Sequence, residues 1–421
     1  MAGRYGAAPR MSSMKGIWIT GLIISGVALI LVLERWALGS FLEDPLAGAP
    51  FILQGDAIRF KEFPLEFNQT SQGKYTTRFE NGTTAVYTID AALQKEMERF
   101  FKRYRVPYGV FVAMEPVTGK VLAIAEYSEE NPKAERLALR STYPAASIFK
   151  LVTASAAIEE KKATPETEIA YHGGLYRLGP RNWIDNPKRD KLKITFGEAL
   201  AKSCNVAFAK VALRWLSAPA LLAYGERFQF NRPIPFELPV QVSRMEIEDS
   251  ERGVARTAAG FGQVGLSPLH AAMIGAAIAN DGVMMTPCLV DFVLDSNGNK
   301  IYECRPRPLA NAVSVETAAS LKKMMAMTVI NGTSRKVFRV RRGETGLRGI
   351  TVGGKTGSLT GEDPPGKYSW FVGMAPMDAP EIAVAALVIN RPKWRIKATE
   401  VAKAGLTAYF HSDPLRRVAD R

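Results

Sequence analysis

A run of uncharged, mostly apolar residues at positions 16–33 governs the organisation of this chain. As a helix rising ~1.5 Å per residue it would be about 27 Å long, close to the ~30 Å hydrocarbon core of a bilayer. Arg10 and Lys15 precede it, and cations at this place retain the N-terminus in the cytoplasm. We therefore predict a cytoplasmic tail at 1–15 and one membrane span at 16–33. A cleaved signal peptide is the alternative, although its apolar core would cover only ~7–15 residues.

Composition sets limits on the rest of the chain. Of 421 residues, 47% are hydrophobic and 23% are charged, which is enough to bury a core and excludes disorder as a description of the whole. The net charge of +14 favours an anionic surface, such as nucleic acid, anionic lipid or a carboxylate-rich polymer, without choosing among them. Three cysteines and three histidines lie far apart in the sequence, so we expect no metal centre.

Two of the cysteines flank a turn-rich segment. Cys288 and Cys304 lie on either side of residues 295–299, between two short apolar runs, which predicts a β-hairpin. The two thiols could face each other across it. A two-residue turn at Asn297-Gly298 would instead place Cys288 opposite Arg307, and on this ground three free thiols are the favoured prediction.

Strand patterns occur at both ends of the segment that starts near residue 84, with mostly helical patterns between 147 and 280. Strands joined by short turns pair antiparallel, so the simplest assembly is an α+β domain over 84–413, with one antiparallel sheet between layers of helices. We predict that residues 34–83 form a stalk or small accessory module and that residues 414–421 form a C-terminal tail. The expected strands are 86–89, 110–114, 121–125, 368–374 and 382–389, with helices after Asp90 and over 399–410.

Two glycine motifs match nucleotide-binding patterns without the context that those patterns need. Residues 349–356 fit G-x-x-x-x-G-K-[ST], but a P-loop opens a helix, and the glycines and prolines in 357–365 cannot start one. Residues 260–265 fit G-x-G-x-x-G, yet no βαβ unit surrounds them. We exclude an ATPase, and we interpret 260–265 as a loop whose glycines let the backbone approach another segment closely.

A serine and a lysine at the start of a predicted helix are spaced so that the lysine could activate the serine as a nucleophile. Ser147 and Lys150 share a face of that helix, which places the amine within reach of the hydroxyl. A serine attacks only when a base takes its proton, and burial or neighbouring cations can make a lysine that base. This S-x-x-K pattern is weak by itself. Two further motifs follow it in order, Ser203-Cys204-Asn205 and Lys355-Thr356-Gly357, and the ordered set is far more specific.

With these motifs the chain resembles the penicillin-binding protein transpeptidases over about residues 84–413. Further stretches fit that family, at 87–90, 115–123, 260–272, 331–333 and 369–373. The resemblance implies a five-stranded antiparallel sheet flanked by helices and no cofactor. It also implies a D,D-transpeptidase of the bacterial inner membrane, with its catalytic domain in the periplasm. Its serine would be acylated by the D-Ala-D-Ala end of a peptidoglycan stem peptide and inhibited covalently by β-lactams.

The resemblance assigns a role to each motif residue. Ser147 would be the nucleophile and Lys150 its base, while Ser203 and Asn205 would relay protons and hold the substrate amide. Lys355 would face the substrate carboxylate. Thr356, Gly357 and Ser358 would line the substrate site, with the Thr356 hydroxyl binding the carboxylate and the N–H groups of Ser147 and Ser358 forming the oxyanion hole. The chain departs from the family at Ser358, where Thr is usual, at Ala145-Ala146, where Pro-Gly is common, and at Cys204.

Other functions remain open at this point. A serine β-lactamase or a D,D-carboxypeptidase would use the same nucleophile, and a β-lactam sensor or silent binding module would keep only the fold. We find no glycosyltransferase pattern in the sequence, so a transpeptidase would need glycan strands from another protein. We therefore expect a membrane-embedded glycan polymerase as partner, contacted through residues 16–33 and the stalk. Gly21 and Ser25 form a small-xxx-small pair suited to close helix packing, although a lipid-facing anchor is equally compatible.

Overall fold

A computed structural model describes residues 49, 51–54, 57–60, 68–69, 74–179, 181–339, 346–391 and 394–412. The predicted tails at 1–15 and 414–421 and the predicted span lie outside these residues. Within the described part, no single helix is both long and apolar enough to cross a membrane. The helices α5 (Asn205–Trp215) and α6 (Ala218–Arg227) meet that criterion only as a pair, and the pair is bent by 109°.

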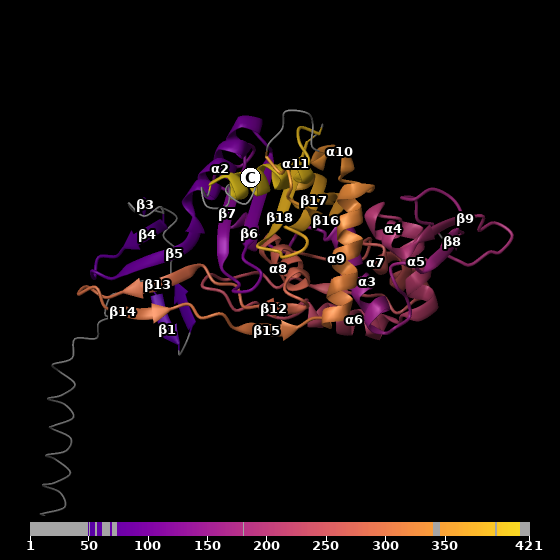
Figure 1. Ribbon diagram of the computed structural model, residues 1–421, viewed down its shortest axis with the longest axis horizontal. Coiled ribbons are helices and arrows are strands. Elements are labelled where there is room, and N and C mark those ends of the chain that lie inside the picture. The colour runs from indigo at the N-terminus through magenta and orange to yellow at the C-terminus, as the bar shows by residue number, and fades with distance from the viewer. Residues whose placement is uncertain are drawn as a thin grey trace, which may run out of the picture.

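The centre of the molecule is a five-stranded antiparallel sheet in the order β16-β17-β18-β6-β7 (Figure 1). Strands from the two ends of the domain meet where β18 pairs with β6, for example at Ala386 opposite Phe111. This pairing confirms the predicted assembly. The strands are β6 (Tyr108–Met114), β7 (Val121–Tyr127), β16 (Gly353–Glu362), β17 (Pro365–Ala375) and β18 (Ile382–Asn390).

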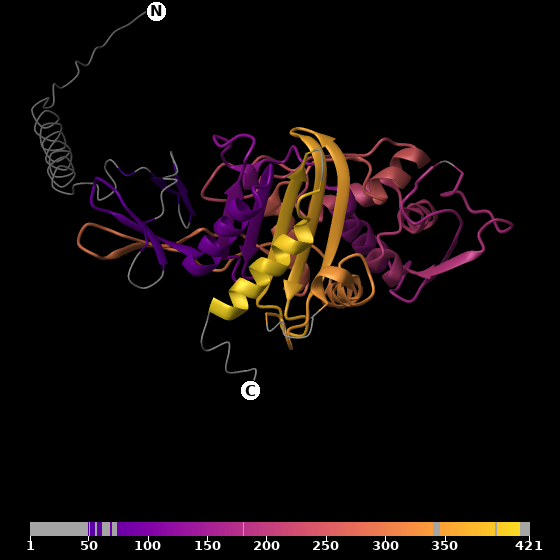
Figure 2. The ribbon, with the colours of Figure 1, turned by 90° about the horizontal axis from the view of Figure 1, so that it is seen from above.

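Helices cover both faces of this sheet. Successive side chains of a strand point to opposite faces, so Phe111 packs with helices α2 (Ala91–Tyr104) and α11 (Ala398–Ser412), whereas Val112 packs with α8 (Pro268–Ala279). Figure 2, which views the molecule from above, shows α11 in yellow lying across the sheet. The helix expected after Asp90 is confirmed, because the Asp90 carboxylate accepts hydrogen bonds from the N–H groups of Ala92 and Leu93 and so caps α2.

A mostly helical region lies on the side of β16 and carries two of the motifs. It is built around α3 (Lys150–Glu159), which packs against α5, α6 and α9 (Val315–Ile330). The other elements there are η2 (Ala146–Phe149), β8 (Glu168–Tyr171), β9 (Leu192–Thr195), α4 (Phe196–Ala201), β10 (Met245–Glu246), α7 (Glu251–Ala258), β11 (Gln263–Val264) and α10 (Arg335–Phe338).

A second sheet forms the opposite end of the molecule, in the order β14-β13-β5-β4-β3 (Figure 1). Here β4 (Lys74–Arg78) pairs with β5 (Thr84–Asp90), so the predicted boundary at 83/84 falls inside a hairpin, and the division at that point stays a prediction. The other strands at this end are β1 (Phe51–Gln54), β2 (Ala57–Phe60), β3 (Asn68–Gln69), β13 (Val290–Leu294) and β14 (Lys300–Glu303). The remaining elements are η1 (Leu137–Leu139), β12 (Val283–Met285) and β15 (Pro308–Asn311), and both η1 and β12 contact α8.

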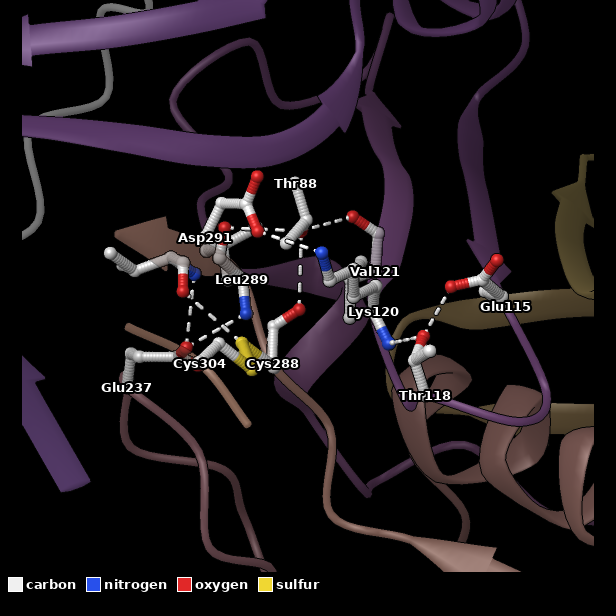
Figure 3. Close-up of a disulfide and its surroundings, with 11 residues drawn as sticks. Thr88, Glu115, Thr118, Lys120, Val121, Glu237, Cys288, Leu289, Asp291 and Cys304 are labelled. Carbon is white, nitrogen blue, oxygen red and sulfur yellow. Dashed lines mark hydrogen bonds and ion pairs between the residues drawn. A yellow bond between two sulfur atoms is a disulfide. The ribbon is translucent and has the colours of Figure 1, made fainter. Parts of the chain in front are cut away.

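The cysteine prediction was wrong. Hairpin β13–β14 forms as expected, but Cys288 and Cys304 are joined in a disulfide, with 6.6 Å between their Cα atoms (Figure 3). The pairing is irregular at this end of the hairpin. The N–H of Cys304 bonds to the carbonyl of Asp291, whereas the N–H of Thr286 bonds to the carbonyl of Arg307. Five steps on one strand thus match three on the other, and this bulge brings Cys288 beside Cys304. Cys204 is a free, buried thiol.

Candidate active site

Ser147 lies in a tight turn at the start of α3. The turn is the 3-10 segment η2, and Lys150 is the first residue of the α-helix that follows. The helical spacing expected for the pair is confirmed, since 2.9 Å separates the Lys150 Nζ atom from the Ser147 Oγ atom. Ala146, immediately before the serine, has a φ of +49°, a left-handed conformation that L-residues with a side chain rarely adopt.

The glycine loop at 260–265 packs against this turn. Gly260 has a φ of +90°, and a Cβ atom there would lie 2.3 Å from the carbonyl oxygen of Ala146 and 2.9 Å from the nitrogen of Ser147. Only glycine fits so close to Ser147. The expectation of a close backbone approach is confirmed at this position. Residues 353–362 form a strand instead of the helix that a P-loop requires, in agreement with the exclusion of an ATPase.

Lys150 is completely buried behind the serine. Besides Ser147, its ammonium nitrogen contacts Asn205 Oδ1 at 2.7 Å and the carbonyl oxygen of Ala259. Burial lowers the pKa of Lys150 from the usual 10.5 to about 7, with the Cys204 thiol acting weakly in the opposite sense. The amine is therefore partly neutral near neutral pH, which is what a general base needs.

The second motif lies in the connection between α4 and α5. Ser203 has a φ of +55° at this bend, and Asn205 is the first residue of α5. The Asn205 amide donates through Nδ2 to the carbonyl of Tyr176 at 2.6 Å, which leaves its Oδ1 for Lys150. The side chain of Cys204 is buried in the core, so its departure from the family pattern does not alter the cleft.

The third motif lies near the start of the edge strand β16. The Lys355 Nζ atom donates to Ser203 Oγ at 3.0 Å and to the Thr356 carbonyl at 2.7 Å. Burial, and secondarily the charge of Lys150, holds the pKa of Lys355 well below its ordinary value. A substrate carboxylate would oppose both effects by favouring the ammonium form. Gly357 lies against the turn that carries Ser147, because a Cβ atom there would lie 3.4 Å from the Ala146 side chain.

These motifs meet at a cavity of about 550 Å³. Lys150 and Lys355 lie buried behind the predicted hydroxyl and amide groups that line it. No local pattern marks three of the residues on the wall, Tyr176, Lys397 and Thr399. Five others lie outside the three motifs but within the stretches 260–272, 331–333 and 369–373 that fit the family. Thr333 is one, and its hydroxyl lies 2.7 Å from that of Thr356. The predicted residues on the wall are Ser147, Ser203, Asn205, Thr356 and Ser358, and the others are Tyr176, Gly260, Phe261, Thr333, Ser369, Trp370, Lys397 and Thr399. Among the described residues, no group of three or more His, Cys, Asp or Glu side chains could hold a metal ion.

Comparison with known proteins identifies similarity over the part of the chain that contains the three motifs. The family described as "Penicillin binding protein transpeptidase domain" matches residues 109–407. The peptidoglycan D,D-transpeptidase PbpA of Mycobacterium tuberculosis H37Rv is 31% identical over 330 residues, covering 70% of this chain and 64% of the relative. The chain thus spans less than two thirds of that relative's length. Stage V sporulation protein D of Bacillus subtilis is 26% identical and aligns with 96% of this chain and 67% of its own.

Solved structures share the fold. The D,D-transpeptidase domain of a peptidoglycan glycosyltransferase from Eggerthella lenta superposes with a TM-score of 0.68 at 26% identity, covering 87% of this chain and 95% of that one. Penicillin-binding protein A of M. tuberculosis, solved as an imipenem acyl-enzyme complex, gives a TM-score of 0.63 at 27% identity, covering 77% and 79%.

Proposed function

This chain belongs to the family of penicillin-binding protein transpeptidases, and we propose that it is a peptidoglycan D,D-transpeptidase that works through an acyl-enzyme on Ser147. One observation carries the proposal. The hydroxyl of Ser147 lies 2.9 Å from a fully buried amine, that of Lys150, whose pKa is lowered to about 7. The acyl-enzyme complexes of penicillin-binding protein A with imipenem and penicillin G support it by analogy.

Acylation would begin when neutral Lys150 takes the hydroxyl proton of Ser147. The Ser147 oxygen then attacks the carbonyl carbon of the penultimate D-alanine of the donor stem peptide. Negative charge develops on the carbonyl oxygen, where the N–H groups of Ser147 and Ser358 would stabilise it. The tetrahedral intermediate collapses when the terminal D-alanine leaves as an amine. Its proton would come from the Ser203 hydroxyl, which is reprotonated by Lys355 at 3.0 Å.

The terminal carboxylate of the donor would bind at the third motif. Thr356 and Ser358 present hydroxyls on the cavity wall, and Lys355 lies buried behind them. Because burial disfavours its ammonium form, Lys355 would gain its proton most readily when the carboxylate is present. Substrate binding would then be coupled to charging of this lysine. Asn205, held between Lys150 and Tyr176, would orient the donor's peptide group.

Crosslinking would complete the cycle. The amine of an acceptor stem peptide attacks the ester carbonyl of the acyl-enzyme and gives up its proton to the Ser203 hydroxyl, which passes a proton back to Lys355. Ser147 leaves as its oxygen regains the proton held by Lys150, so both lysines return to their starting states. Attack by water instead would give a D,D-carboxypeptidase product. A β-lactam would follow the first half of this path and remain as an ester on Ser147.

Labelling with a fluorescent penicillin and intact-protein mass spectrometry test the nucleophile. We expect a persistent adduct of one β-lactam on the native chain and none on Ser147→Ala, since that change removes only the attacking oxygen. Ser155→Ala is the matched control, because this buried serine of α3 bonds to the carbonyl of Leu151 at 2.7 Å and does not line the cavity. A persistent adduct on Ser147→Ala would contradict the assignment, and rapid adduct turnover on the native chain would indicate a β-lactamase.

The location and partner follow from the N-terminal sequence. We propose that residues 16–33 anchor the protein in the bacterial inner membrane, with the catalytic domain in the periplasm and a membrane-embedded glycan polymerase as partner. An enzyme confined to the membrane plane reaches nascent glycan only beside its source. Replacing 16–33 with an unrelated apolar helix should reduce both co-purification with the polymerase and crosslinking in cells. Unchanged association and crosslinking would leave the segment as an anchor only.

A further inference from the structure

The wall of the catalytic cavity includes a charged side chain that the proposed mechanism does not use. Lys397 lines this cavity together with Ser147, and the other residues described as lining it are uncharged. The two motif lysines, Lys150 and Lys355, are completely buried behind the wall. Lys397 is exposed, with its amine 5.6 Å from the centre of the Trp394 ring, and within the described part of the chain it forms no ion pair. Its charge is therefore available to a ligand bound in the cavity.

The backbone that carries Lys397 is held firmly beside the cavity. The buried side chain of Asn390 bonds to two backbone groups in residues 395–396, at 2.8 and 3.0 Å. The N–H of Lys397 donates to the Glu400 carboxylate at 2.6 Å, and the N–H of the next residue donates to Ser369 Oγ at 3.0 Å. These bonds fix the position of the lysine backbone, so little ordering of the chain is left for a ligand to bring about.

The register of the sheet places Lys397 beside the acyl half of a bound donor. Ser369 pairs with Ser358, whose N–H would stabilise the oxygen of the acylated carbonyl. Because the residue after Lys397 bonds to Ser369, the lysine lies beside this part of the cavity. Thr356, which would bind the terminal carboxylate, comes two residues earlier in β16. The hydroxyl-bearing residue Thr399 follows Lys397 closely and lines the same wall.

We propose that Lys397 forms a subsite for a second carboxylate, carried by the acyl half of the donor. The inference rests on the acyl-enzyme mechanism proposed above. The terminal carboxylate of the donor would bind at the third motif, and a further carboxylate upstream of the scissile bond would reach Lys397, with the Thr399 hydroxyl as a second donor. A neutral amide in its place would not attract the lysine.

The covalent connection within the donor provides the selectivity of this subsite. An exposed amine by itself binds any small anion weakly and does not choose among them. A carboxylate that belongs to the molecule bound at Ser147 is held near Lys397 at a high effective concentration, which a free ion in solution does not reach. The subsite therefore distinguishes acyl donors by the charge of their acyl half.

Three penicillins test this subsite, because they share one nucleus with its carboxylate and differ at the α-carbon of the acyl side chain. Carbenicillin has a carboxylate there, benzylpenicillin a hydrogen and ampicillin an ammonium group. Stopped-flow acylation of the purified full chain in detergent gives a second-order rate constant for each. We expect Lys397→Gln to lower the ratio of the carbenicillin constant to the benzylpenicillin constant by roughly two- to fivefold, the loss expected for one exposed charge pair. Added salt should lower the same ratio in the native chain.

Reversal of the charge gives a second variant. Lys397→Glu should lower the carbenicillin-to-benzylpenicillin ratio further and raise the ampicillin-to-benzylpenicillin ratio. Lys367→Gln is the matched control and should keep the native ratios, because this lysine of β17 is exposed and does not line the cavity.

Two outcomes would overturn the subsite alone. Equal losses on all three penicillins in Lys397→Gln would show that the lysine acts on the carboxylate that they share, and native ratios in both Lys397 variants would show that it binds no part of the acyl half. Failure of all three penicillins to acylate the native chain would be a different result, because it would contradict the acyl-enzyme on Ser147 and the subsite together.

Discussion

The amine of Lys150 and the hydroxyl of Ser147 lie 2.9 Å apart, and the same amine contacts Asn205 and the carbonyl of Ala259. Residues far apart in sequence thus enclose one nitrogen atom. This enclosure, rather than a nearby cation, is the main reason for its lowered pKa. The lysine is thereby set up to take a proton from one particular oxygen.

Removing this base should slow acylation strongly. We expect Lys150→Ala to lower the second-order rate constant of acylation by penicillin by at least ~10²-fold, the lower end of what a positioned base contributes. Lys150→Arg should also fail, because a guanidinium cannot be deprotonated in a protein. Stopped-flow acylation measures both. Lys202→Ala, which removes a lysine that pairs with Glu198 outside the cavity, is the control. Acylation of Lys150→Ala at the native rate would show that another group accepts the proton.

The lowered pKa of Lys150 also predicts a pH dependence. Only the neutral amine can accept the proton, so acylation should become faster as the pH rises through about 7. With that pKa, the neutral fraction grows about tenfold between about pH 6 and about pH 8, and the rate should follow it. Glu237, whose pKa burial raises to about 7, titrates in the same range. If Lys150 causes the pH dependence, Glu237→Gln should show the same profile as the native chain. Loss of the pH dependence in this variant would show that it arises from Glu237 instead.

Lys355 should discriminate between charged and neutral substrates. We expect Lys355→Ala to reduce kcat/KM by roughly 10- to 10²-fold for donors with a free terminal carboxylate, the range expected for a hydrogen bond to a charged group. Neutral thioester donors should be affected much less. The control is Lys367→Ala, since Lys367 is exposed on β17 and does not line the cavity. Equal losses on both kinds of donor would rule out an anion-binding role.

Ala146 should tolerate replacement by glycine better than other buried alanines do. Its φ of +49° carries strain of ~1–2 kcal/mol, which glycine relieves. That relief offsets the lost buried methyl group, ~0.8 kcal/mol, and the greater freedom of glycine in the unfolded chain, ~0.4–1 kcal/mol. Ala146→Gly should thus change the free energy of unfolding by less than about 0.5 kcal/mol. Ala154→Gly, in the buried middle of α3, should cost about 2 kcal/mol. Urea unfolding compares the two, and equal losses would show that Ala146 is unstrained.

Local pattern predicted four strands of the central sheet, because strand and turn signals are short-range. It missed β16, and it did not show that the strand expected at 86–89 belongs to the second sheet. The order of the three motifs predicted that Ser147 and Lys150 lie together, and 2.9 Å separates their side chains. The resemblance singled out 331–333, but it did not show that the Thr333 hydroxyl lies beside that of Thr356, because this contact depends on the packing of α9 beside β16. The burial that lowers the pKa of Lys150 likewise depends on Ala259, more than a hundred residues away.

The disulfide between Cys288 and Cys304 likewise could not be predicted from the local sequence. A regular hairpin would separate the cysteines, but Cys288 is held by Gly119, whose carbonyl accepts its N–H at 3.0 Å. This contact belongs to the β6–β7 turn, and no pattern near residue 288 indicates it.

The disulfide closes a loop whose ends are 16 residues apart. Removing the crosslink frees the unfolded chain, and for a loop of this size the chain-entropy model gives a cost of about 3 kcal/mol. We expect Cys288→Ser/Cys304→Ser to lower the free energy of unfolding by about that amount in urea. A reducing agent should lower the stability of the native chain by a similar amount and leave the double variant unchanged, which controls for effects on Cys204. If thiol titration shows that both cysteines of the native chain are reduced while its unfolding midpoint stays the same, the disulfide does not contribute to stability.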